Sequence, residues 1–521
     1  MLRKCMGFIL PLAVATATLL PACGGKKVDN EGASAGKNVA VEEESSVAEV
    51  KSEFVPEIVG TYEAEDGTFQ GNVKSGSSRS GYSGTGYATG FNKAEEDTCT
   101  FSIDISDTGF YDLDFTGAAD DHKENKVYVD GAYMGVVVYE KGGYADSYIK
   151  RVYLETGKHE VKVEAYWGYI DLDKLTVATS EPIPDDFYEV NAKLINPNAD
   201  ENTRRLMSYL ADNYGKKVLS GQYSQDGMLG KEFTVVKKVT GKTPAIIGLD
   251  MIDYSPSRAA HDLKSNAVQS AINFWNQGGI VTFCWHWNLD EKYCTKEWWQ
   301  GFSSDTTNFD IEKVMNGEDQ EAYDLLMRDI DVIAGKLKEL QDAGVPVIWR
   351  PLHEAGGGWF WWGEKGPEPY KKLYRLLYDK LTNEYGLNNL IWLWNGQDKD
   401  FYPGDEYVDI IGEDIYPGEK VYSSQASKYF EAAAYTDAKK MVVLSENGCV
   451  PDPDLLKRDG AMWGFWCTWG QEFVAKDIAV YSYSDQYTEA DKLKEFYEND
   501  LVITEDELPD LKQYPIREEL Q

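Results

Sequence analysis

Two glutamates of this 521-residue chain follow apolar runs that have the length of buried strands. Glu354 comes after VPVIW in the segment RPLHEAGGGWFWWG (residues 350–363), and Glu446 lies in VVLSENG (residues 442–448). Each of them alone is explained equally well as an ordinary acid at the end of a strand. Two carboxylates brought to one cleft can hydrolyse a glycosidic bond, because one protonates the leaving oxygen while the other attacks the anomeric carbon or activates water.

A run of large aromatic residues follows the first glutamate. Trp359–Trp362 are four aromatic residues in succession, and neighbours on an extended backbone point to opposite sides, so they cannot all face one interior. Gly356–Gly358 before them allow a sharp turn that would bring Trp359 back towards Glu354. Aromatic residues make up 13% of the chain, with 15 Trp and 34 Tyr, and such rings pack well against sugar C–H groups. A large core would raise the aromatic content too, so the pattern favours a sugar cleft without requiring one.

The charge of the chain excludes several classes of partner. Lysine and arginine together number 52 and aspartate and glutamate 88, so the formal net charge is −36. Nucleic acids and anionic lipid surfaces both need basic patches, so neither is expected as an electrostatic partner. A neutral substrate bound by a monomer fits such a surface, although acidity that serves only solubility explains the charge as well.

Both glutamates lie in residues 193–516, where short apolar stretches alternate with helical patterns. EAYDLLMRDIDVIAGKLKELQDAG and PYKKLYRLLYDKLTNEYG repeat apolar residues at three- and four-residue spacing, which predicts amphipathic helices. Eight strand–helix units predict a (β/α)8 TIM barrel rather than an open sheet. The expected strands are KVLSGQY, PAIIGLDM, GIVTFCWHWN, VPVIWRPLHE, NLIWLWN, VDIIGEDIYP, MVVLSEN and AMWGFWCTW.

In a barrel of this kind the active site lies at the carboxyl ends of the strands. Glu354 and Glu446 follow the fourth and seventh expected strands, so both should reach the same rim. A retaining hydrolase needs their carboxyl groups roughly 5–5.5 Å apart, with Glu354 protonated and Glu446 ionised. Seven of the eight strands end in polar or aromatic groups: Asp250, His286 with Trp287, His353 with Glu354, Trp394 with Asn395, Asp414 with Tyr416, Glu446 with Asn447, and Trp466 with Trp469.

No metal or other cofactor is expected for catalysis. The histidines do not form an HExxH motif, and the cysteines and histidines lack the spacing that is typical of zinc sites. Export would permit disulfides, but the sequence leaves their pairing open. The cysteines in question are Cys99, Cys284, Cys294, Cys449 and Cys467.

The first residues resemble a bacterial lipoprotein signal. MLRKCMGFILPLAVATATLLPACGG has basic residues, then an apolar stretch that is short for a membrane-spanning helix, then a small residue before Cys23. We therefore expect residues 1–22 to be a signal peptide and Cys23 to carry lipid. The mature chain would be exported and lipid-anchored to the cell envelope, at the outer membrane, on its surface or periplasmic face. Residues 23–58 are rich in Gly, Ala, Ser, Glu and Lys, which predicts a flexible tether.

Residues 59–180 have a different pattern. Short alternating runs such as CTFSIDI and NKVYVDGAYMGVVVY are cut by Gly, Asp and Asn, and the pair Asp130-Gly131 predicts a hairpin turn. Several such strands with no helix-length run between them predict a jelly-roll-like β-sandwich. Residues 181–192, EPIPDDFYEVNA, carry two prolines and several acids and are predicted to be a linker.

The segment VIWRPLHEAGGGWFWWG, together with VVLSENG, resembles glycoside hydrolase family 26, chiefly β-mannanases, over roughly residues 193–516. The resemblance implies a retaining (β/α)8 enzyme in which Glu354 is the acid/base and Glu446 the nucleophile. Ala355-Gly356 stands where the family commonly has Met-Asn, a departure that concerns the local loop shape. The resemblance further implies a set of substrate-cleft residues: His286, His353, Trp359, Tyr416 as hydrogen-bond partner of the nucleophile, Trp466 as an aromatic floor, and Trp298 or Trp299 beyond the cleavage point.

The segments YEAEDG, SGYSGTGYATGF and GYIDLDKLTV resemble carbohydrate-binding module family 35 over roughly residues 60–178. That resemblance implies a structural calcium site at Glu63, Glu65 and Asp173, because hard carboxylate oxygens suit calcium. Solvated acids at a sheet edge are the alternative. Two aromatic residues are candidates either for stacking on a sugar or for the core: Tyr87 and Trp167.

The leading hypothesis is a lipid-anchored retaining hydrolase that cleaves β-1,4-mannosidic linkages inside mannan, galactomannan or glucomannan. One alternative is a relative that releases mannobiose from chain ends or cleaves another β-glycan. Another is a non-catalytic glycan-binding surface lipoprotein, which the presence of both carboxylates argues against. The ligand of the N-terminal module and the tolerance of galactose side groups stay open.

Overall fold

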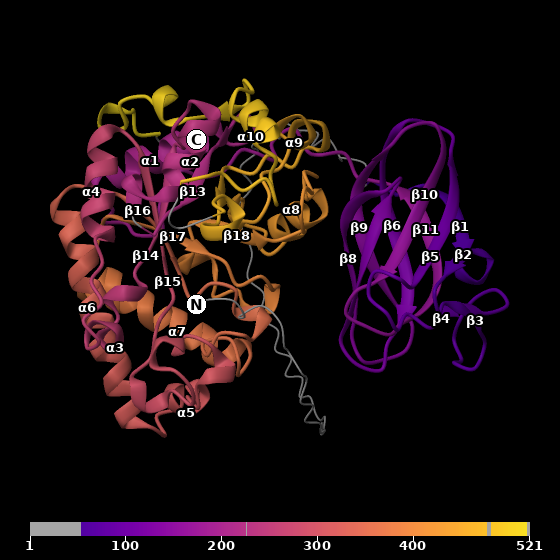
Figure 1. The fold of residues 1–521 in the computed structure, drawn as a ribbon, viewed down its shortest axis with the longest axis horizontal. Helices are drawn as coiled ribbons and strands as arrows, with labels where there is room; N and C mark the ends of the chain where they lie inside the picture. Colours follow the sequence, from indigo (N-terminus) through magenta and orange to yellow (C-terminus); the bar gives the residue numbers. More distant parts are fainter. Residues whose placement is uncertain (1–53, 226, 477–480, 518–521) are drawn as a thin grey trace, which may run out of the picture. The chain divides into compact units, whose positions relative to one another are not determined.

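The structure, a computed structural model, describes residues 54–225, 227–476 and 481–517. The expected signal peptide, Cys23 and all but the last residues of the expected tether lie outside these ranges. Within them, antiparallel sheets are followed by a closed parallel barrel, so the predicted fold class is confirmed (Figure 1). Among the described helices, none has both the length and the hydropathy that crossing a bilayer requires.

The first region consists of two antiparallel sheets that share one hydrophobic core. Its strands are β1 (Ile58–Glu63), β2 (Thr68–Gln70), β3 (Lys74–Gly76), β4 (Tyr87–Thr89), β5 (Thr98–Ile105), β6 (Gly109–Ala118), β7 (Lys123–Val129), β8 (Ala132–Tyr139), β9 (Ala145–Leu154), β10 (Gly157–Ala165) and β11 (Asp171–Thr179). One sheet has the order β3-β4-β11-β6-β9, with β1 paired to β11, and the other has the order β2-β5-β10-β7-β8. Phe101 and Ile103 of β5 are buried while Ser102 between them is exposed, as the alternating pattern predicts.

The predicted hairpin joins β7 and β8. Asp130 and Gly131 have φ angles of 50° and 82°, the left-handed values that a tight two-residue turn between twisted strands requires. Glycine adopts this conformation without a steric penalty, and aspartate tolerates it better than most residues.

The barrel closes through eight parallel strands, one from each of the eight predicted segments. They are β13 (Gly221–Tyr223), β14 (Ile246–Asp250), β15 (Ile280–Trp285), β16 (Val347–Pro351), β17 (Leu390–Trp394), β18 (Ile410–Ile415), β19 (Met441–Asn447) and β20 (Trp466–Thr468). A short parallel pair, β12 (Val218–Leu219) and β21 (Val502–Ile503), lies outside the barrel sheet.

Helices surround the barrel strands (Figure 1). They are α1 (Glu201–Asn213), α2 (Lys231–Thr240), α3 (Pro256–Ala259), α4 (Ala267–Gln277), α5 (Ile311–Met315), α6 (Gln320–Asp342), α7 (Pro367–Tyr378), α8 (Ala426–Ala433), α9 (Pro453–Asp459) and α10 (Ala490–Tyr497). The two helices expected from periodicity are α6 and α7. Asp319 caps α6 by accepting a hydrogen bond from the backbone N–H of Ala322 (3.0 Å).

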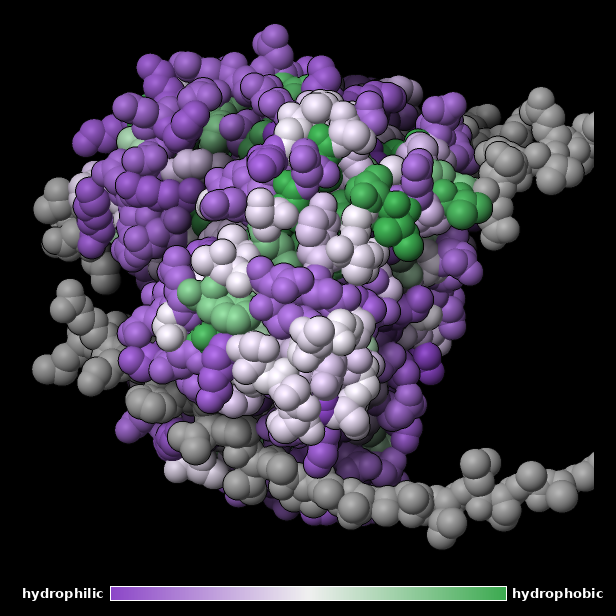
Figure 2. Space-filling view, turned by 90° about the vertical axis from the view of Figure 1, so that its right-hand side faces the viewer, coloured by the Kyte–Doolittle hydropathy of each residue, from purple (hydrophilic) through white to green (hydrophobic). Residues whose placement is uncertain are grey.

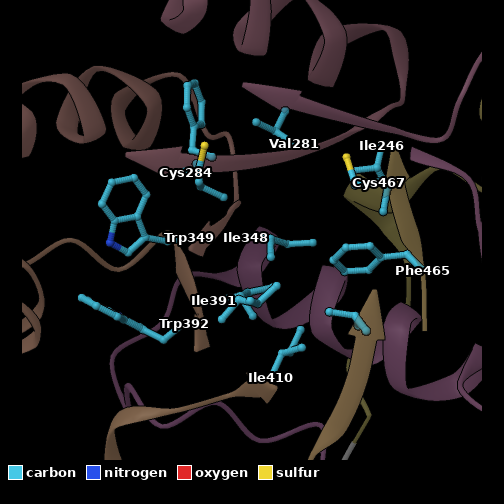
Figure 3. Packing of buried hydrophobic residues seen from close by; sticks show 14 of the residues in the cluster. Ile246, Val281, Cys284, Ile348, Trp349, Ile391, Trp392, Ile410, Phe465 and Cys467 are labelled. Carbon is cyan, nitrogen blue, oxygen red and sulfur yellow. The ribbon is translucent and has the colours of Figure 1, made fainter. Parts of the chain in front are cut away.

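Alternate side chains of each barrel strand face opposite layers. In Figure 3, Ile348, Ile391 and Phe465 gather in the barrel interior, whereas Trp349 and Trp392 project to the other side of their strands. All five side chains are buried, because the helix layer covers the outer face. The strands therefore read as continuous apolar runs, and a polar residue within one of them is unusual.

Residues 181–192, expected to be a linker, contain no helix or strand. Their second half nevertheless packs on the barrel: Phe187 and Tyr188 contact its core, and the Tyr188 hydroxyl donates to the carbonyl of Gly460 (2.6 Å). The surface shown in Figure 2 is mainly hydrophilic, with hydrophobic residues in small groups, as the large net charge leads one to expect.

Candidate active site

The turn after β16 places Glu354 at the rim. Leu352 and Glu354 have φ angles of 51° and 53°, a left-handed conformation that costs a non-glycine residue about 1–3 kcal/mol. Hydrogen bonds from the neighbouring strand end offset this cost. The backbone N–H of Glu354 donates to the carbonyl of Asn395 (2.7 Å), and that of Gly356 donates to Gly396 (2.8 Å). The strained turn aims the carboxyl group at the centre of the rim.

The glycine loop returns Trp359 to this carboxyl group. Its indole Nε1–H donates to Oε2 of Glu354 (2.8 Å), while its side chain stays 40% exposed. A Cβ on Gly357 would lie 1.9 Å from the Trp359 ring, so this position needs a glycine. Ser304 fixes the loop from outside, since its N–H donates to the Trp359 carbonyl and its hydroxyl to the Gly358 carbonyl, both at 2.9 Å.

The other three aromatic residues of the run are buried. Trp361 donates its indole N–H to the carbonyl of Trp287 (2.8 Å), and Trp362 donates to the carbonyl of His353 (2.8 Å). Phe360 stacks on Trp362 with ring centroids 4.5 Å apart. The run therefore supplies one exposed ring and three rings that support the loop.

Glu446 at the end of β19 is held by charge-assisted hydrogen bonds. Arg350, a fully buried residue of β16, donates from Nη2 to Oε2 of Glu446 (2.6 Å). The hydroxyl of Tyr416 donates to Oε1. Arg350 also donates to Asp414 of β18 and to the side-chain oxygen of Asn395. A carboxylate with these partners is stabilised in its ionised form.

Oxygens of Glu354, Asp414 and Glu446 all lie within 4.8 Å of one another. Burial and the negative charges of Asp414 and Glu446 raise the pKa of Glu354 well above its ordinary value. Burial, with the charge of Glu446, raises the pKa of Asp414 to about 7, against the effect of Arg350. The raised pKa favours a protonated Glu354, whereas Glu446 accepts hydrogen bonds from Arg350 and Tyr416, so the surroundings of the two glutamates differ.

Two histidines complete this side of the rim. His286 follows β15 and is partly buried, and His353 is fully buried beside Glu354. Their Nε2 atoms lie 3.2 Å apart, and Nδ1 of His286 contacts Oδ2 of Asp250 at 2.6 Å. Burial and the charge of Arg350 lower the pKa of His353 well below its usual value, so its ring is neutral.

The structure therefore brings five of the predicted residues to the rim around Glu446: Glu354, His286, His353, Trp359 and Tyr416. Trp466 is not among them. It is fully buried, with its ring 6.1 Å from that of Tyr497 in α10. Because Phe465 faces the barrel interior, the next side chain faces the helix layer. Trp469, beyond the strand end, lies at the rim instead, with its ring 4.9 Å from that of Tyr223.

Trp298 and Trp299 lie in one short turn of the loop after β15, and both are partly exposed. The ring of His261 is stacked on Trp298, with centroids 3.8 Å apart and 6° between the planes. Arg258 donates to the carbonyl of Trp299 (2.9 Å) and so fixes the turn.

Sequence reasoning did not assign Arg350, Asp250 or Trp469 to the site. Arg350 could have been recognised from the sequence, because an arginine within the apolar run VPVIWRP has to be paired when the strand is buried. Asp250 and Trp469 were visible only as strand-end residues, and nothing in their spacing reveals which group they contact.

In the sandwich, the three expected calcium ligands converge on the loop of residues 83–86. Ser83 donates from its hydroxyl to Glu63 (2.7 Å) and from its backbone N–H to Asp173 (2.8 Å), while Gly86 N–H donates to Glu65 (2.9 Å). The second oxygen of Glu65 is buried and has no hydrogen-bond partner among the described residues. A carboxylate oxygen in that position fits a cation ligand.

The two aromatic candidates of the sandwich differ in exposure. Tyr87 is buried, and its hydroxyl accepts a hydrogen bond from the backbone N–H of Arg79 (3.0 Å), so it belongs to the core. Trp167 is 44% exposed, with its ring edge-on to that of His122. The five cysteines of the described residues are free thiols.

A (β/α)8 barrel that brings an oxygen of Glu354 and an oxygen of Glu446 within 4.8 Å of each other at its rim has the geometry of a retaining glycoside hydrolase. The chain belongs to glycosyl hydrolase family 26, whose model matches residues 195–507. The model of carbohydrate binding module family 35 matches residues 60–180. Both resemblances seen in the sequence are thereby confirmed. Enzymes of family 26 need no cofactor for catalysis.

Relatives match across most of the chain. A mannan endo-1,4-beta-mannosidase of Thermothelomyces thermophilus is 41% identical over 86% of this chain and 90% of its own length. Mannan endo-1,4-beta-mannosidase B of a Piromyces species is 37% identical over 86% of this chain and 77% of its own length. The crystal structure of a Podospora anserina GH26-CBM35 beta-(1,4)-mannanase is 39% identical and covers 87% of this chain and 99% of its own, with a TM-score of 0.59.

Proposed function

We propose that this chain is a retaining endo-β-mannanase that cleaves β-1,4-mannosidic linkages within mannan, galactomannan and glucomannan. The observation that carries the proposal is the pair of carboxyl groups, Glu354 and Glu446, which have oxygens within 4.8 Å of each other at the rim, with the pKa of Glu354 raised and Glu446 bound by Arg350. The relatives named as mannan endo-1,4-beta-mannosidases support the choice of substrate and of internal cleavage.

In the first step Glu446 attacks the anomeric carbon, and the bond to the leaving sugar breaks. Glu354 gives its proton to the departing oxygen, so a neutral hydroxyl leaves. Arg350 and the Tyr416 hydroxyl donate hydrogen bonds to Glu446 and hold the attacking carboxylate in place. The exposed face of Trp359 supports the sugar beside Glu354.

In the second step the ionised Glu354 removes a proton from water, and the oxygen of that water attacks the glycosyl–Glu446 ester. The sugar leaves with its original anomeric configuration, because two inversions have taken place. Glu354 is protonated again at the end, as it was at the start.

The test is reducing-end release from linear mannan, galactomannan, glucomannan, xylan and mixed-linkage glucan, with the products resolved by chain length. Mixed mannan oligosaccharides that later shorten are the expected result. Mannobiose as the sole early product would show exo cleavage. Cleavage of xylan or glucan in preference to mannan would contradict mannan as the substrate. If no polymer is cleaved, the remaining hypothesis is a non-catalytic glycan-binding protein.

We further propose that the chain is exported and lipid-anchored through Cys23 to the cell envelope. The support is the signal-like sequence before this residue, which lies outside the described structure. Labelling cells with radioactive palmitate should mark the wild type and Cys5→Ala, a matched control in the same segment, but not Cys23→Ala. Incorporation by Cys23→Ala would contradict the anchor site.

We also propose that the sandwich binds a polysaccharide and is stabilised by calcium at Glu63, Glu65 and Asp173. The buried, unpaired oxygen of Glu65 supports this site. Removing calcium with a chelator should lower the Tm of the sandwich, and Glu65→Gln should have a lowered Tm that the chelator does not lower further. The exposed Glu57→Gln is the control and should behave as the wild type. A Tm that no chelator changes would leave the acids as solvated edge residues.

A further inference from the structure

Asp250 ends β14 and contacts His286, one of the two histidines, with both of its carboxylate oxygens. Its Oδ2 accepts from Nδ1 of His286 (2.6 Å), and its Oδ1 accepts from the backbone N–H groups of His286 (3.1 Å) and Ile252 (2.9 Å). Although burial raises the pKa of Asp250, the His286 ring and these hydrogen bonds lower it below its ordinary value, so the group is ionised. A carboxylate only accepts, so Nδ1 of His286 carries the hydrogen.

The hydrogen on Nδ1 of His286 determines which ring donates the hydrogen bond between the two histidines. The Nε2 atoms of His286 and His353 are 3.2 Å apart, and one of them must donate to the other. His353 is neutral and has one ring hydrogen. When His286 carries a single ring hydrogen and uses it on Asp250, His353 donates from Nε2 and His286 accepts.

The remaining ring atom supports the same direction. Nδ1 of His353 is buried and has no hydrogen-bond partner among the described residues. In this arrangement it carries a lone pair, which suits the neighbouring positive charge of Arg350. The reverse arrangement would bury an unpaired N–H group there, and orphaned buried donors are rare.

We propose that Asp250 is a positioning residue that sets the direction of a hydrogen-bond chain from His353 through His286 to its own carboxylate. The chain fixes the ring tautomers and orientations at the side of the rim where Glu354 acts, since His353 directly precedes Glu354. The role deepens the proposed mannanase reaction and rests on it, but the proton positions are a property of the resting protein and can be measured without substrate.

Asp250→Asn gives a sharp test. The side-chain oxygen of asparagine can keep both backbone hydrogen bonds, while its NH2 group replaces the acceptor that faces His286. A donor in that position forces the hydrogen of His286 to Nε2 and the hydrogen of His353 to Nδ1, so both tautomers reverse. We expect kcat/KM on mannan oligosaccharides to fall about 10- to 100-fold, because the rings are then wrongly presented to the sugar.

The readout is ¹⁵N NMR of the histidine rings of the purified chain at pH 7.5. The chain has only 5 histidines; His122→Gln, His159→Gln and His261→Gln identify three of them, and the signals lost in His353→Gln tell the remaining two apart. The wild type should show His286 protonated at Nδ1 and His353 at Nε2, and Asp250→Asn should show the opposite. The control is Asp409→Asn, another buried carboxylate, which accepts from the backbone N–H groups of Ile195 and Trp392. It should leave both tautomers unchanged.

Unchanged ring signals in Asp250→Asn would overturn the proposal even if activity fell, since the residue would then act only on stability. A doubly protonated His286 in the wild type would overturn it too. If the wild type cleaves no mannan, the proposed function fails, while the NMR result still decides what Asp250 does.

Discussion

At the scale of residues, Arg350 gives the two glutamates different electrostatic surroundings. Its guanidinium donates to Glu446 and to Asp414, whereas Glu354 receives the neutral indole N–H of Trp359. A positive partner stabilises an ionised carboxylate, and a buried carboxyl group near two negative ones holds its proton. The chemistry of each glutamate therefore depends on its neighbours more than on its own residue type.

Removing either glutamate should abolish most turnover for different reasons. Glu354→Ala should lower kcat on mannan about 10²- to 10⁴-fold, the usual contribution of a general acid. On an aryl β-mannobioside, whose leaving group needs no proton, it should still release a rapid burst of phenol. Glu446→Ala should release no burst. The exposed, ion-paired Glu364→Ala is the control and should match the wild type. Normal turnover in either folded active-site variant would remove that residue from the mechanism.

The pH dependence follows from the raised pKa of Glu354. The acid works while it is protonated, so kcat/KM should be present below this pKa and be lost as the pH rises through it. Asp414→Asn removes a negative charge that helps to raise the pKa, so the alkaline limb should move to lower pH. Glu413→Gln changes the adjacent residue of the same strand, on its opposite face, and should leave the limb in place. If the alkaline limb of Asp414→Asn stays at the wild-type pH, the limb reports the titration of a group other than Glu354.

At the scale of elements, periodicity was sufficient to predict the strands but not where their side chains point at the rim. All eight barrel strands and the helices α6 and α7 lie where apolar spacing predicts them. Trp466 is a residue for which periodicity does not predict the direction of the side chain. Its register within β20, on which its direction depends, is set by pairing with neighbouring strands. The rim partners of Asp250 and Arg350 come from other strands, and a contact between distant segments leaves no periodic signal.

Gly448, the residue after β19, shows that a single residue at the end of a strand can determine the geometry of the site. A Cβ there would lie 2.9 Å from the Tyr416 ring and 3.1 Å from that of Phe473, which packs against Tyr416. Gly448→Ala should therefore displace the Tyr416 hydroxyl from Glu446 and lower kcat/KM about 10-fold or more. Gly335→Ala, in the middle of α6 with open space around it, should keep full activity and stabilise the chain by about 0.5–1 kcal/mol. Equal activity of the two variants would contradict the steric argument.

At the scale of the whole molecule, the chain combines a hydrolase barrel with a module whose family binds carbohydrate. The two parts have separate hydrophobic cores. Residues 181–192 have to stay with the barrel in any truncation, because Phe187 and Tyr188 pack in its core.

A chain that begins at residue 181 should hydrolyse soluble mannohexaose at the rate of the longer protein. On insoluble mannan it should be slower, because it has lost a second attachment to the polymer and with it the high local concentration of substrate. Initial rates on both substrates, with Tm as a check on folding, measure the difference. Equal rates on insoluble mannan would show that the module does not attach the enzyme to mannan.

The two steps proposed for Glu354 also determine where the enzyme obtains its acid. In the proposed cycle, the proton that Glu354 gives to the leaving sugar is replaced by one from the water that hydrolyses the glycosyl–enzyme ester, so each turnover ends with as many protons at the rim as it began with. The pH of the medium therefore sets the protonation state of the rim before the first turnover, and no further proton has to be supplied. Hydrolysis by this route therefore neither consumes nor releases protons overall.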